Sequence, residues 1–342
     1  MPIIARLLPL CFLGGMMLST VTATETAVTV AAIPIAGDAD WRAQIQVLDN
    51  GRVRVAADAL HGGRLIEYAL AGRNALYADP THPTWVYPEN HDYLGPAGGR
   101  IDIGPEEALP VHLALWTGAW AIERVDPLHL RMTSPADTLT GVQLTRDVNL
   151  DPDSTHLRCT QTMRNITDHP LRRGYWGRSL SPGGGIFVTS LSADSRFPKQ
   201  YIQYSNWPDS YIQMRPTDPA ITIRDGHLLL RGAPQQYKIG LDTRSGWLAY
   251  LMRNGLLFVK RFPVHPERRY ADIAGLTICV WSLADRMVEL EPLGPEELLA
   301  PGQSAAFSEE WWLLDHPFPA AGEYLDPLQL HALIDQHAVS RP

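Results

Sequence analysis

The stretch Gly246–Phe262 reads GWLAYLMRNGLLFVKRF and sets the pattern for the rest of the chain. Two runs of apolar and aromatic residues flank the dipeptide Asn254-Gly255. Both residues of that dipeptide tolerate the positive φ angles that a tight turn between antiparallel strands requires. The stretch therefore predicts a β-hairpin made of two largely buried strands.

Similar patterns recur on both sides of this hairpin. Asn50-Gly51 and Asp225-Gly226 are further turn dipeptides between apolar runs. Strand-like segments are expected at 45–48, 53–55, 64–70, 113–124, 128–134, 141–150 and 155–166. No repeat of about 20–50 residues and no low-complexity linker interrupts the series. The pattern predicts an all-β protein, a large antiparallel β-sandwich in one domain.

One segment near the end of the chain is clearly helical. In Asp326–His337, Asp326 can cap the helix and Pro327 suits the first turn, and Leu330, Leu333 and Ile334 make an apolar face. We therefore divide the chain as follows: a signal peptide at 1–23, a flexible leader at 24–40, a β-sandwich domain at 41–316, and a tail with a short C-terminal helix at 317–342.

Residues 1–23 have the features of a secretion signal. Arg6 supplies the positive end, residues 7–18 an apolar run, and Val21-Thr22-Ala23 a small-residue cleavage pattern. Cys11 follows a leucine rather than a small residue, which argues against a lipid anchor. We expect cleavage near Ala23 and a periplasmic or secreted protein without a membrane anchor.

The composition restricts the partners of the chain. Its net charge is −8, and losing Arg6 with the signal makes it −9, which argues against nucleic acid or an anionic membrane. Ten tryptophans and twelve tyrosines suit strands and stacking on sugar rings. The two cysteines outside the signal, Cys159 and Cys279, lie in strand-like runs, and we expect them to be buried free thiols.

The stretch Leu94–Glu107, LGPAGGRIDIGPEE, carries the first candidate site residues. Its centre alternates like a strand, so Arg100 and Asp102 share one face and Ile101 and Ile103 the other. A guanidinium and a carboxylate on one face could hydrogen-bond a polyhydroxyl ligand. Equally, Arg100 and Asp102 could belong to a surface or structural ion-pair network.

No cofactor is expected. His82, His91 and Asp92 fall in a long loop without HxxE or HxH spacing, so loop hydrogen bonds are their default role and no metal site is predicted. The glycines of Pro182–Gly185 lack the GK[ST] ending of a phosphate loop.

Four segments together resemble the galactose mutarotase-like (aldose 1-epimerase) superfamily. They are Gly62-Gly63-Arg64, Gly99-Arg100-Ile101, residues 165–176 (NITDHPLRRGYW) and Val288–Leu314 (VELEPLGPEELLAPGQSAAFSEEWWLL). The resemblance covers about residues 45–316. It implies a supersandwich with a sugar cleft on one sheet face.

The resemblance also implies acid–base chemistry on a sugar. In active members a glutamate on the penultimate strand takes the anomeric hydroxyl proton and a histidine protonates the ring oxygen. Glu289 and Glu291 lie two residues apart, hence on one strand face, and either could be the base. Glu289 is slightly favoured from its spacing to Pro301-Gly302. Arg100 matches the sugar-binding arginine of the family.

The expected histidine is missing from its usual segment. The sequence has Tyr175-Trp176 there, and His169 lies a few residues early, in a turn. Trp176 suits stacking on a sugar. Lys238 and Lys260, both in strand patterns, could replace the histidine as proton donor or bind an anionic sugar group. Alternatively, they could lie on a solvated sheet face without a role in the site. Alternatively, one glutamate of the pair could be the proton donor to the ring oxygen.

Three functions remain, each with a small carbohydrate as partner. The first is an epimerase or mutarotase acting on an exported or periplasmic sugar. The second is a non-catalytic carbohydrate-binding protein that lacks the histidine. The third, a lyase or hydrolase using Glu289 and Glu291 or Glu106 and Glu107, ranks last because neighbours on one strand face cannot straddle a glycosidic bond.

Overall fold

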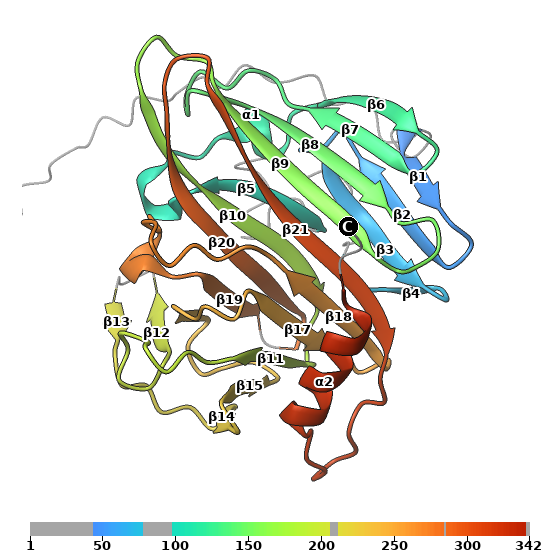
Figure 1. The fold of residues 1–342 in the computed structure, drawn as a ribbon, viewed down its shortest axis with the longest axis vertical. Coiled ribbons are helices and arrows are strands. Elements are labelled where there is room, and N and C mark those ends of the chain that lie inside the picture. Colours follow the sequence, from blue (N-terminus) through green and yellow to red (C-terminus); the bar gives the residue numbers. More distant parts are fainter. Residues whose placement is uncertain (1–43, 78–97, 206–210, 284, 340–342) are drawn as a thin grey trace, which may run out of the picture. The chain divides into compact units, whose positions relative to one another are not determined.

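The computed structural model describes residues 44–77, 98–205, 211–283 and 285–339. These residues form two antiparallel sheets (Figure 1). The first sheet has the strand order β1-β2-β3-β5-β10-β20-β19-β16-β12-β13, with β4 paired to β3. The second has the order β14-β15-β11-β17-β18-β21-β9-β8-β7-β6. The predicted all-β class and antiparallel sandwich are confirmed.

The strands of the first sheet are β1 (Gln46–Asp49), β2 (Val53–Asp58), β3 (Arg64–Leu70), β4 (Arg73–Asn74), β5 (Gly99–Gly104), β10 (Leu171–Pro182), β12 (Ile202–Ser205), β13 (Tyr211–Gln213), β16 (Lys238–Leu241), β19 (Ile278–Leu283) and β20 (Met287–Leu299). Those of the second are β6 (Ala121–Asp126), β7 (His129–Thr133), β8 (Val142–Leu150), β9 (Leu157–Asn165), β11 (Ile186–Ser190), β14 (Ile221–Arg224), β15 (His227–Arg231), β17 (Trp247–Leu251), β18 (Leu256–Arg261) and β21 (Ser304–Asp315). The helices are α1 (Leu113–Trp116) and α2 (Pro327–His337), and short 3-10 turns span Glu106–Ala108 and Ile273–Gly275.

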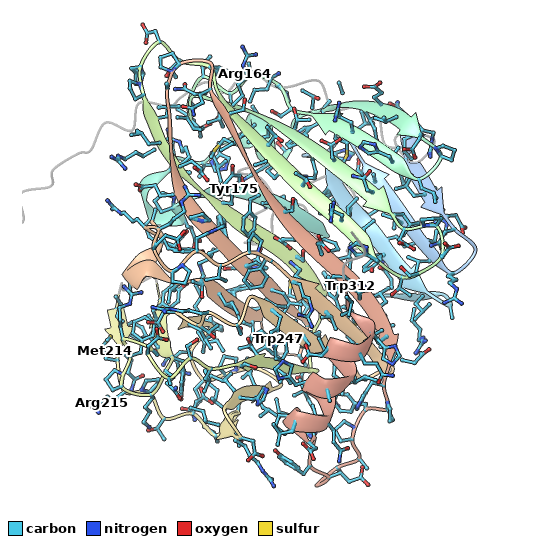
Figure 2. The ribbon with its side chains drawn as sticks, viewed as in Figure 1. Arg164, Tyr175, Met214, Arg215, Trp247 and Trp312 are labelled. Carbon is cyan, nitrogen blue, oxygen red and sulfur yellow. The ribbon has the colours of Figure 1, made fainter. Side chains whose placement is uncertain are left out.

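The main core lies between the two sheets and is filled by the side chains that their strands turn inward. Ile101 and Ile103 of β5 are buried in it, and Tyr175 of β10 stacks on Phe307 of β21 with ring centroids 5.3 Å apart (Figure 2). The hairpin at Asn254-Gly255 joins β17 to β18 as the sequence predicts. We call the face of the first sheet turned away from the second its outer face.

Helix α2 covers part of the other side of the second sheet. Asp326 caps it by accepting hydrogen bonds from the backbone N–H groups of Leu328 and Gln329. Leu330 and Ile334 pack in a cluster that includes Trp247 and Trp312 (Figures 1 and 2). The C-terminal helix predicted from the sequence is therefore confirmed, cap and apolar face included.

One predicted strand is wrong. Residues 113–124 form the one-turn helix α1 and then β6, which begins only at Ala121. The apolar residues of this segment pack around turns instead of alternating along an extended strand. Backbone N–H groups of Trp116 and Thr117 donate to His112 and Leu113 carbonyls, at 3.2 and 2.8 Å. Residues 113–120 therefore stay outside the sheets, and only the end of the segment joins one, as β6.

Gly177, in the middle of β10, leaves space for a carboxylate in the core. A Cβ at this position would lie 2.1 Å from Oε1 of Glu309, a buried residue of β21. We expect Gly177→Ala to lower the free energy of unfolding by ~1–3 kcal/mol, as overpacking does. At Gly174 in the same strand the nearest atom to such a Cβ is 3.6 Å away. Gly174→Ala is the matched control and should change stability by less than ~1 kcal/mol in urea unfolding. Equal losses in both variants would contradict this account.

Candidate functional site

Six of the seven predicted site residues lie on the outer face of neighbouring strands. They are Arg100 and Asp102 of β5, Trp176 of β10, Glu289 and Glu291 of β20, and Lys238 of β16. In the register of β5 and β10, Asp102 lies opposite Trp176, and Arg100 lies opposite Arg178. The sheet order β5-β10-β20-β19-β16 thus gathers residues that are up to 191 positions apart in the sequence.

The backbone before β5 explains how this strand reaches its place. Gly98 has a φ of 106°, and a Cβ there would lie 2.2 Å from the carbonyl oxygen of Leu65. Only glycine fits such a conformation and so close an approach. The Gly98-Gly99 pair therefore lets β5 enter the sheet beside β3 and carry Arg100 and Asp102 onto the outer face.

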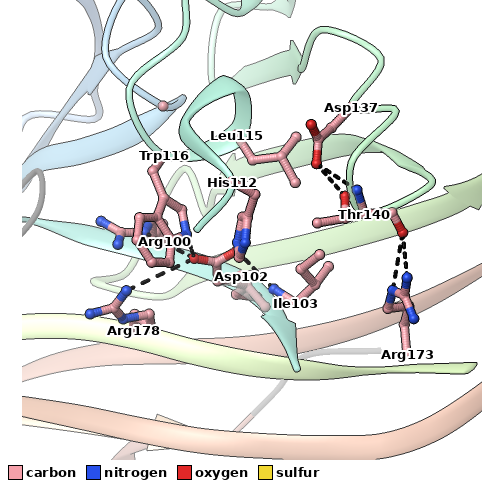
Figure 3. A network of polar contacts seen from close by, with 12 residues as sticks. Arg100, Asp102, Ile103, His112, Leu115, Trp116, Asp137, Thr140, Arg173 and Arg178 are labelled. Atoms are coloured by element: carbon pink, nitrogen blue, oxygen red, sulfur yellow. Dashed lines mark hydrogen bonds and ion pairs between the residues drawn. The ribbon is translucent and has the colours of Figure 1, made fainter. Parts of the chain in front are cut away.

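The carboxylate of Asp102 is the centre of a polar network (Figure 3). Its Oδ1 lies 3.1 Å from Nε2 of His112, and its Oδ2 accepts a hydrogen bond from the indole N–H of Trp116. Two guanidinium groups are close, with Nε of Arg100 at 3.6 Å and Nη1 of Arg178 at 4.0 Å from Oδ2. Burial alone would raise the pKa of Asp102, but His112 and the two arginines lower it below its ordinary value.

His112 is a site residue that the sequence reasoning missed. Its Nδ1 lies 2.8 Å from the carbonyl oxygen of Pro110, and its Nε2 faces the Asp102 carboxylate. Both of these groups only accept hydrogen bonds, so both ring nitrogens carry a proton. Burial works against the charge, yet Asp102 raises the pKa of His112 above its ordinary value. The only signal was a histidine in the glycine- and proline-rich region after Asp102, hidden by the wrong strand prediction.

Arg178, also unrecognised in the sequence, joins the network to Glu289. Its Nε donates to Oε1 of Glu289 at 2.6 Å, and its guanidinium lies 4.1 Å from the ring centre of Trp176. Burial would raise the pKa of Glu289, but the charge and hydrogen bond of Arg178 lower it below its ordinary value. Glu289 is therefore an ionised carboxylate at neutral pH, even though it is only 4% exposed.

Glu291 has the opposite electrostatic situation. It is 1% exposed, and its Oε1 has no hydrogen-bond partner among the described residues. Burial, followed by the negative charge of Glu289, raises the pKa of Glu291 to about 8. The two carboxyls, two residues apart on β20, thus form a pair of one base and one acid at neutral pH.

The raised pKa of Glu291 makes stability depend on pH. Because the folded state holds this proton more tightly than the unfolded chain, its stabilising effect is complete below about pH 4.5 and is lost as the pH rises to about 8. We expect the free energy of unfolding of the wild type, minus that of Glu291→Gln, to fall across this range by up to ~1.4 kcal/mol per pH unit. Urea unfolding from pH 4 to 9 measures the difference. A difference that stays constant with pH would contradict the assignment.

Lys238 and Asp272 complete the network on the side of β16. Lys238 forms an ion pair with Glu106, and its Nζ lies 5.7 Å from the ring centre of Trp176. Asp272, which the sequence reasoning did not select, accepts the backbone N–H of Glu106 at 3.3 Å. Burial is the main cause that raises the pKa of Asp272 to about 7. A second titratable carboxyl therefore lies at this edge of the network.

Lys260 does not share the outer face, and its predicted placement is corrected. Its side chain is fully buried between the two sheets, where Nζ lies 2.8 Å from Oε2 of Glu309. Lys260 is next to Val259, and the two alternate across the strand, so Val259 packs under α2 while Lys260 points inward. The residues next to Lys260 in the sequence do not indicate which way its side chain points, because both faces of β18 carry apolar residues.

Both cysteines are free, as predicted. Cys159 belongs to the core between the sheets. Cys279 lies on the outer face opposite Glu291, and its Sγ is 2.8 Å from the hydroxyl of Tyr204. Burial raises the pKa of both thiols, so neither is a thiolate at neutral pH.

The structure also has a cavity of about 290 Å³. Its lining includes Arg196, Arg244, Arg268 and Tyr270, but none of the predicted site residues. We place the candidate site on the outer face because that is where the unusual protonation states occur. Within the described ranges no group of three or more His, Cys, Asp or Glu side chains could hold a metal ion. His82, His91 and Asp92 lie outside these ranges. No helix among the described residues is long and apolar enough to cross a membrane.

Comparisons with known proteins support the fold. No family model matches the chain, and no curated protein matches its sequence. A structure from Escherichia coli K12, described provisionally as an aldose 1-epimerase, superposes with a TM-score of 0.56 at 12% identity over 79% of this chain and 99% of that one. A galactose mutarotase-like protein from Lactobacillus casei gives a TM-score of 0.52 at 10% identity over 79% and 100% of the two chains. A structure from Salmonella typhimurium, described provisionally as a mutarotase, gives 0.51 at 12% identity over 80% and 90%. The chain therefore has the galactose mutarotase-like fold.

Proposed function

We propose that the protein interconverts the anomers of an aldose sugar by acid–base ring opening, on an exported or periplasmic substrate. The observation that carries this proposal is the buried pair of Glu289 and Glu291, one ionised and one protonated at neutral pH. Anomer exchange needs one proton acceptor and one proton donor within reach of the same sugar ring. The fold shared with proteins described as epimerases and mutarotases supports the same reaction class.

In the proposed reaction Glu289 takes the proton of the anomeric hydroxyl while Glu291 gives its proton to the ring oxygen. The bond between the anomeric carbon and the ring oxygen breaks, and an open-chain aldehyde forms. Rotation exposes the other face of the carbonyl, and ring closure reverses both proton transfers. Each carboxyl returns to its starting state, so the step consumes no other reactant.

The neighbouring cations have a binding role in this scheme. Arg178 holds Glu289 in its ionised form, and Arg100 and Lys238 can donate hydrogen bonds to sugar hydroxyls. Asp102 can accept one. Trp176 lies opposite Leu293, two residues from Glu291, and provides an aromatic ring on that side of the carboxyl pair.

Glu291 is a better proton donor than His112. Both nitrogens of His112 already bond to Pro110 and Asp102, so giving up a proton would break one of these hydrogen bonds. Glu291 has an oxygen without a partner among the described residues. The engaged histidine is also the observation that favours a second candidate function, sugar binding without turnover.

A two-part experiment separates these functions. A thermal-shift screen of monosaccharides, disaccharides and uronic acids first identifies sugars that bind, because a ligand that binds the folded state raises its melting temperature. Anomer exchange of each binding sugar is then measured by NMR exchange spectroscopy, with protein-free buffer as the control. Anomer exchange above the spontaneous rate supports the enzymatic function. If sugars bind but the exchange of none is accelerated, the enzymatic function is refuted and sugar binding without turnover takes its place. Sequencing the N-terminus of the exported form tests cleavage near Ala23.

A further inference from the structure

Lys260 reaches from the second sheet to the strand that carries the two carboxyls. Its Nζ donates to the main-chain carbonyl oxygen of Leu290 at 3.0 Å. Leu290 is the residue between Glu289 and Glu291, and its side chain lies in the core. The peptide of Leu290 sets the direction of both neighbouring side chains, because residues i−1 and i+1 of a strand leave the same face. Lys260 therefore bonds the carboxyl-bearing segment from behind.

Arg146 of β8 makes the equivalent contact with β5. Its Nη2 donates to the main-chain carbonyl oxygen of Ile101 at 2.7 Å, and Ile101 lies between Arg100 and Asp102. The same guanidinium also donates to the carbonyl oxygen of Gly63. Arg146 is 2% exposed. Two strands of the candidate site are thus each held from the core by one buried cation.

Both cations are themselves held in place. Lys260 is paired with Glu309, whose Oε2 also accepts the indole N–H of Trp311 at 2.9 Å. The Nε of Arg146 donates to Oε1 of Gln161 at 3.1 Å. Burying charges costs more than filling the same space with apolar side chains, so the packing of a sandwich does not require these residues. Their hydrogen bonds to main-chain carbonyl oxygens fix the orientation of the peptide groups that they contact, which apolar packing cannot do.

We propose that Lys260 and Arg146 are positioning residues of the candidate site, each orienting a pair of outer-face side chains through the carbonyl oxygen between them. The expected effect on anomer exchange rests on the proposed function, whereas the orientation of the outer-face side chains does not depend on it.

The test compares three variants of the full chain. Lys260→Met with Glu309→Gln removes the donor to Leu290 and both charges of the buried pair together. Glu309→Gln alone keeps the lysine donor but leaves its ammonium buried without a carboxylate, so its loss of stability measures the charge pair apart from the hydrogen bond to Leu290. Phe258→Leu weakens the core two residues from Lys260 on the same face, where Phe258 contacts Tyr68 and Trp311, and keeps the Lys260 donor.

Two readouts are measured on each variant. One is the titration midpoint of the Glu291 carboxyl, followed by carbon-13 NMR of side-chain-labelled glutamate and assigned with Glu291→Gln. The other is the rate of anomer exchange beside the affinity for the same sugar. We expect the double variant to lower the midpoint by about one pH unit or more, because a released strand separates the carboxyls and admits water. The exchange rate should fall ~10- to 100-fold with less than ~3-fold change in affinity, as for misplaced catalytic groups.

The controls decide whether position or stability is responsible. Phe258→Leu should keep the exchange rate within ~3-fold and the midpoint within a few tenths of a pH unit. A wild-type midpoint in the double variant, or an equal loss of rate in Phe258→Leu, overturns the inference. The titration needs no substrate. If the protein accelerates the anomer exchange of no sugar, the proposed function fails, but the titration midpoint still tests the positioning role of Lys260.

Should the double variant fail to fold, Arg146→Lys provides the same decision for β5. A lysine keeps the charge but cannot bond Gly63, Ile101 and Gln161 at once. The inference requires the titration midpoint of His112, which depends on Asp102, to fall by at least about half a pH unit. An unchanged midpoint overturns it.

Discussion

Glu289→Gln and Glu291→Gln are each expected to slow anomer exchange by at least ~100-fold, the usual contribution of a positioned acid or base. The first variant loses the proton acceptor, and the second loses the proton that the ring oxygen would receive. An amide keeps the size of each side chain, so sugar affinity should change by less than ~3-fold. NMR exchange spectroscopy and a sugar titration on the same samples measure the two quantities.

The pH profile makes this prediction sharper. Wild-type exchange should require Glu289 ionised and Glu291 protonated, so the rate falls in acid and falls again as the pH passes about 8. The fall at alkaline pH should disappear from the residual rate of Glu291→Gln. Glu297→Gln is the matched control, because Glu297 lies on the same strand and bonds Arg268 instead. Exchange at the wild-type rate in both site variants would refute the enzyme and leave the binding protein.

The second large effect concerns stability. Arg178→Met leaves Glu289 buried without its main cationic partner, and breaking such a pair costs ~3–5 kcal/mol of unfolding free energy. With Arg178 present, the lowered pKa of Glu289 stabilises the fold above the unfolded pKa, and this contribution is lost in acid. Without it, burial raises that pKa, and the fold is penalised more as the pH rises. The loss should therefore be large at pH 8 and smaller at pH 4.

Arg172→Met provides the control for this loss. Arg172 lies on the same strand and pairs with Glu296 at 2.8 Å, but its side chain is 60% exposed. Exposed pairs contribute only ~0–1 kcal/mol. Urea unfolding of both variants at pH 4 and pH 8 gives the four free energies of unfolding that are compared. Similar losses for Arg178→Met and Arg172→Met, or a loss for Arg178→Met that is the same at pH 4 and pH 8, would show that Arg178 is not the electrostatic partner described here.

Several parts of the site were readable from the sequence because they depend on local spacing. Glu289 and Glu291 lie two residues apart in a strand-like run, so they had to share a face. Arg100 and Asp102 followed from the same alternation after a glycine-rich turn. The sequence did not show which cation would contact which carboxylate. Arg178 was overlooked beside Trp176, although the two also lie two residues apart.

His112 and Lys260 show where local reasoning ends. The segment after His112 is apolar enough to be a strand, and only its packing over the sheet makes it a helical turn beside Asp102. Lys260 has apolar neighbours on both sides, because β18 is covered by the core on one face and by α2 on the other. A strand buried on both faces carries no alternation, so its sequence cannot say which side a polar residue faces.

By itself, the sequence determined the all-β class, the hairpin at Asn254-Gly255, the capped helix from Pro327 to His337 and the shared face of Glu289 and Glu291. The last three depend on residues close together in the chain, and the class on the recurrence of such local patterns. Only the tertiary structure decided that β5, β10, β20 and β16 lie close together, and hence which cation meets which carboxylate. The strand order places Arg178 against Glu289, whereas burial and the negative charge of Glu289 dominate the surroundings of Glu291. Their protonation states therefore differ, because charge and burial act through space and not along the chain.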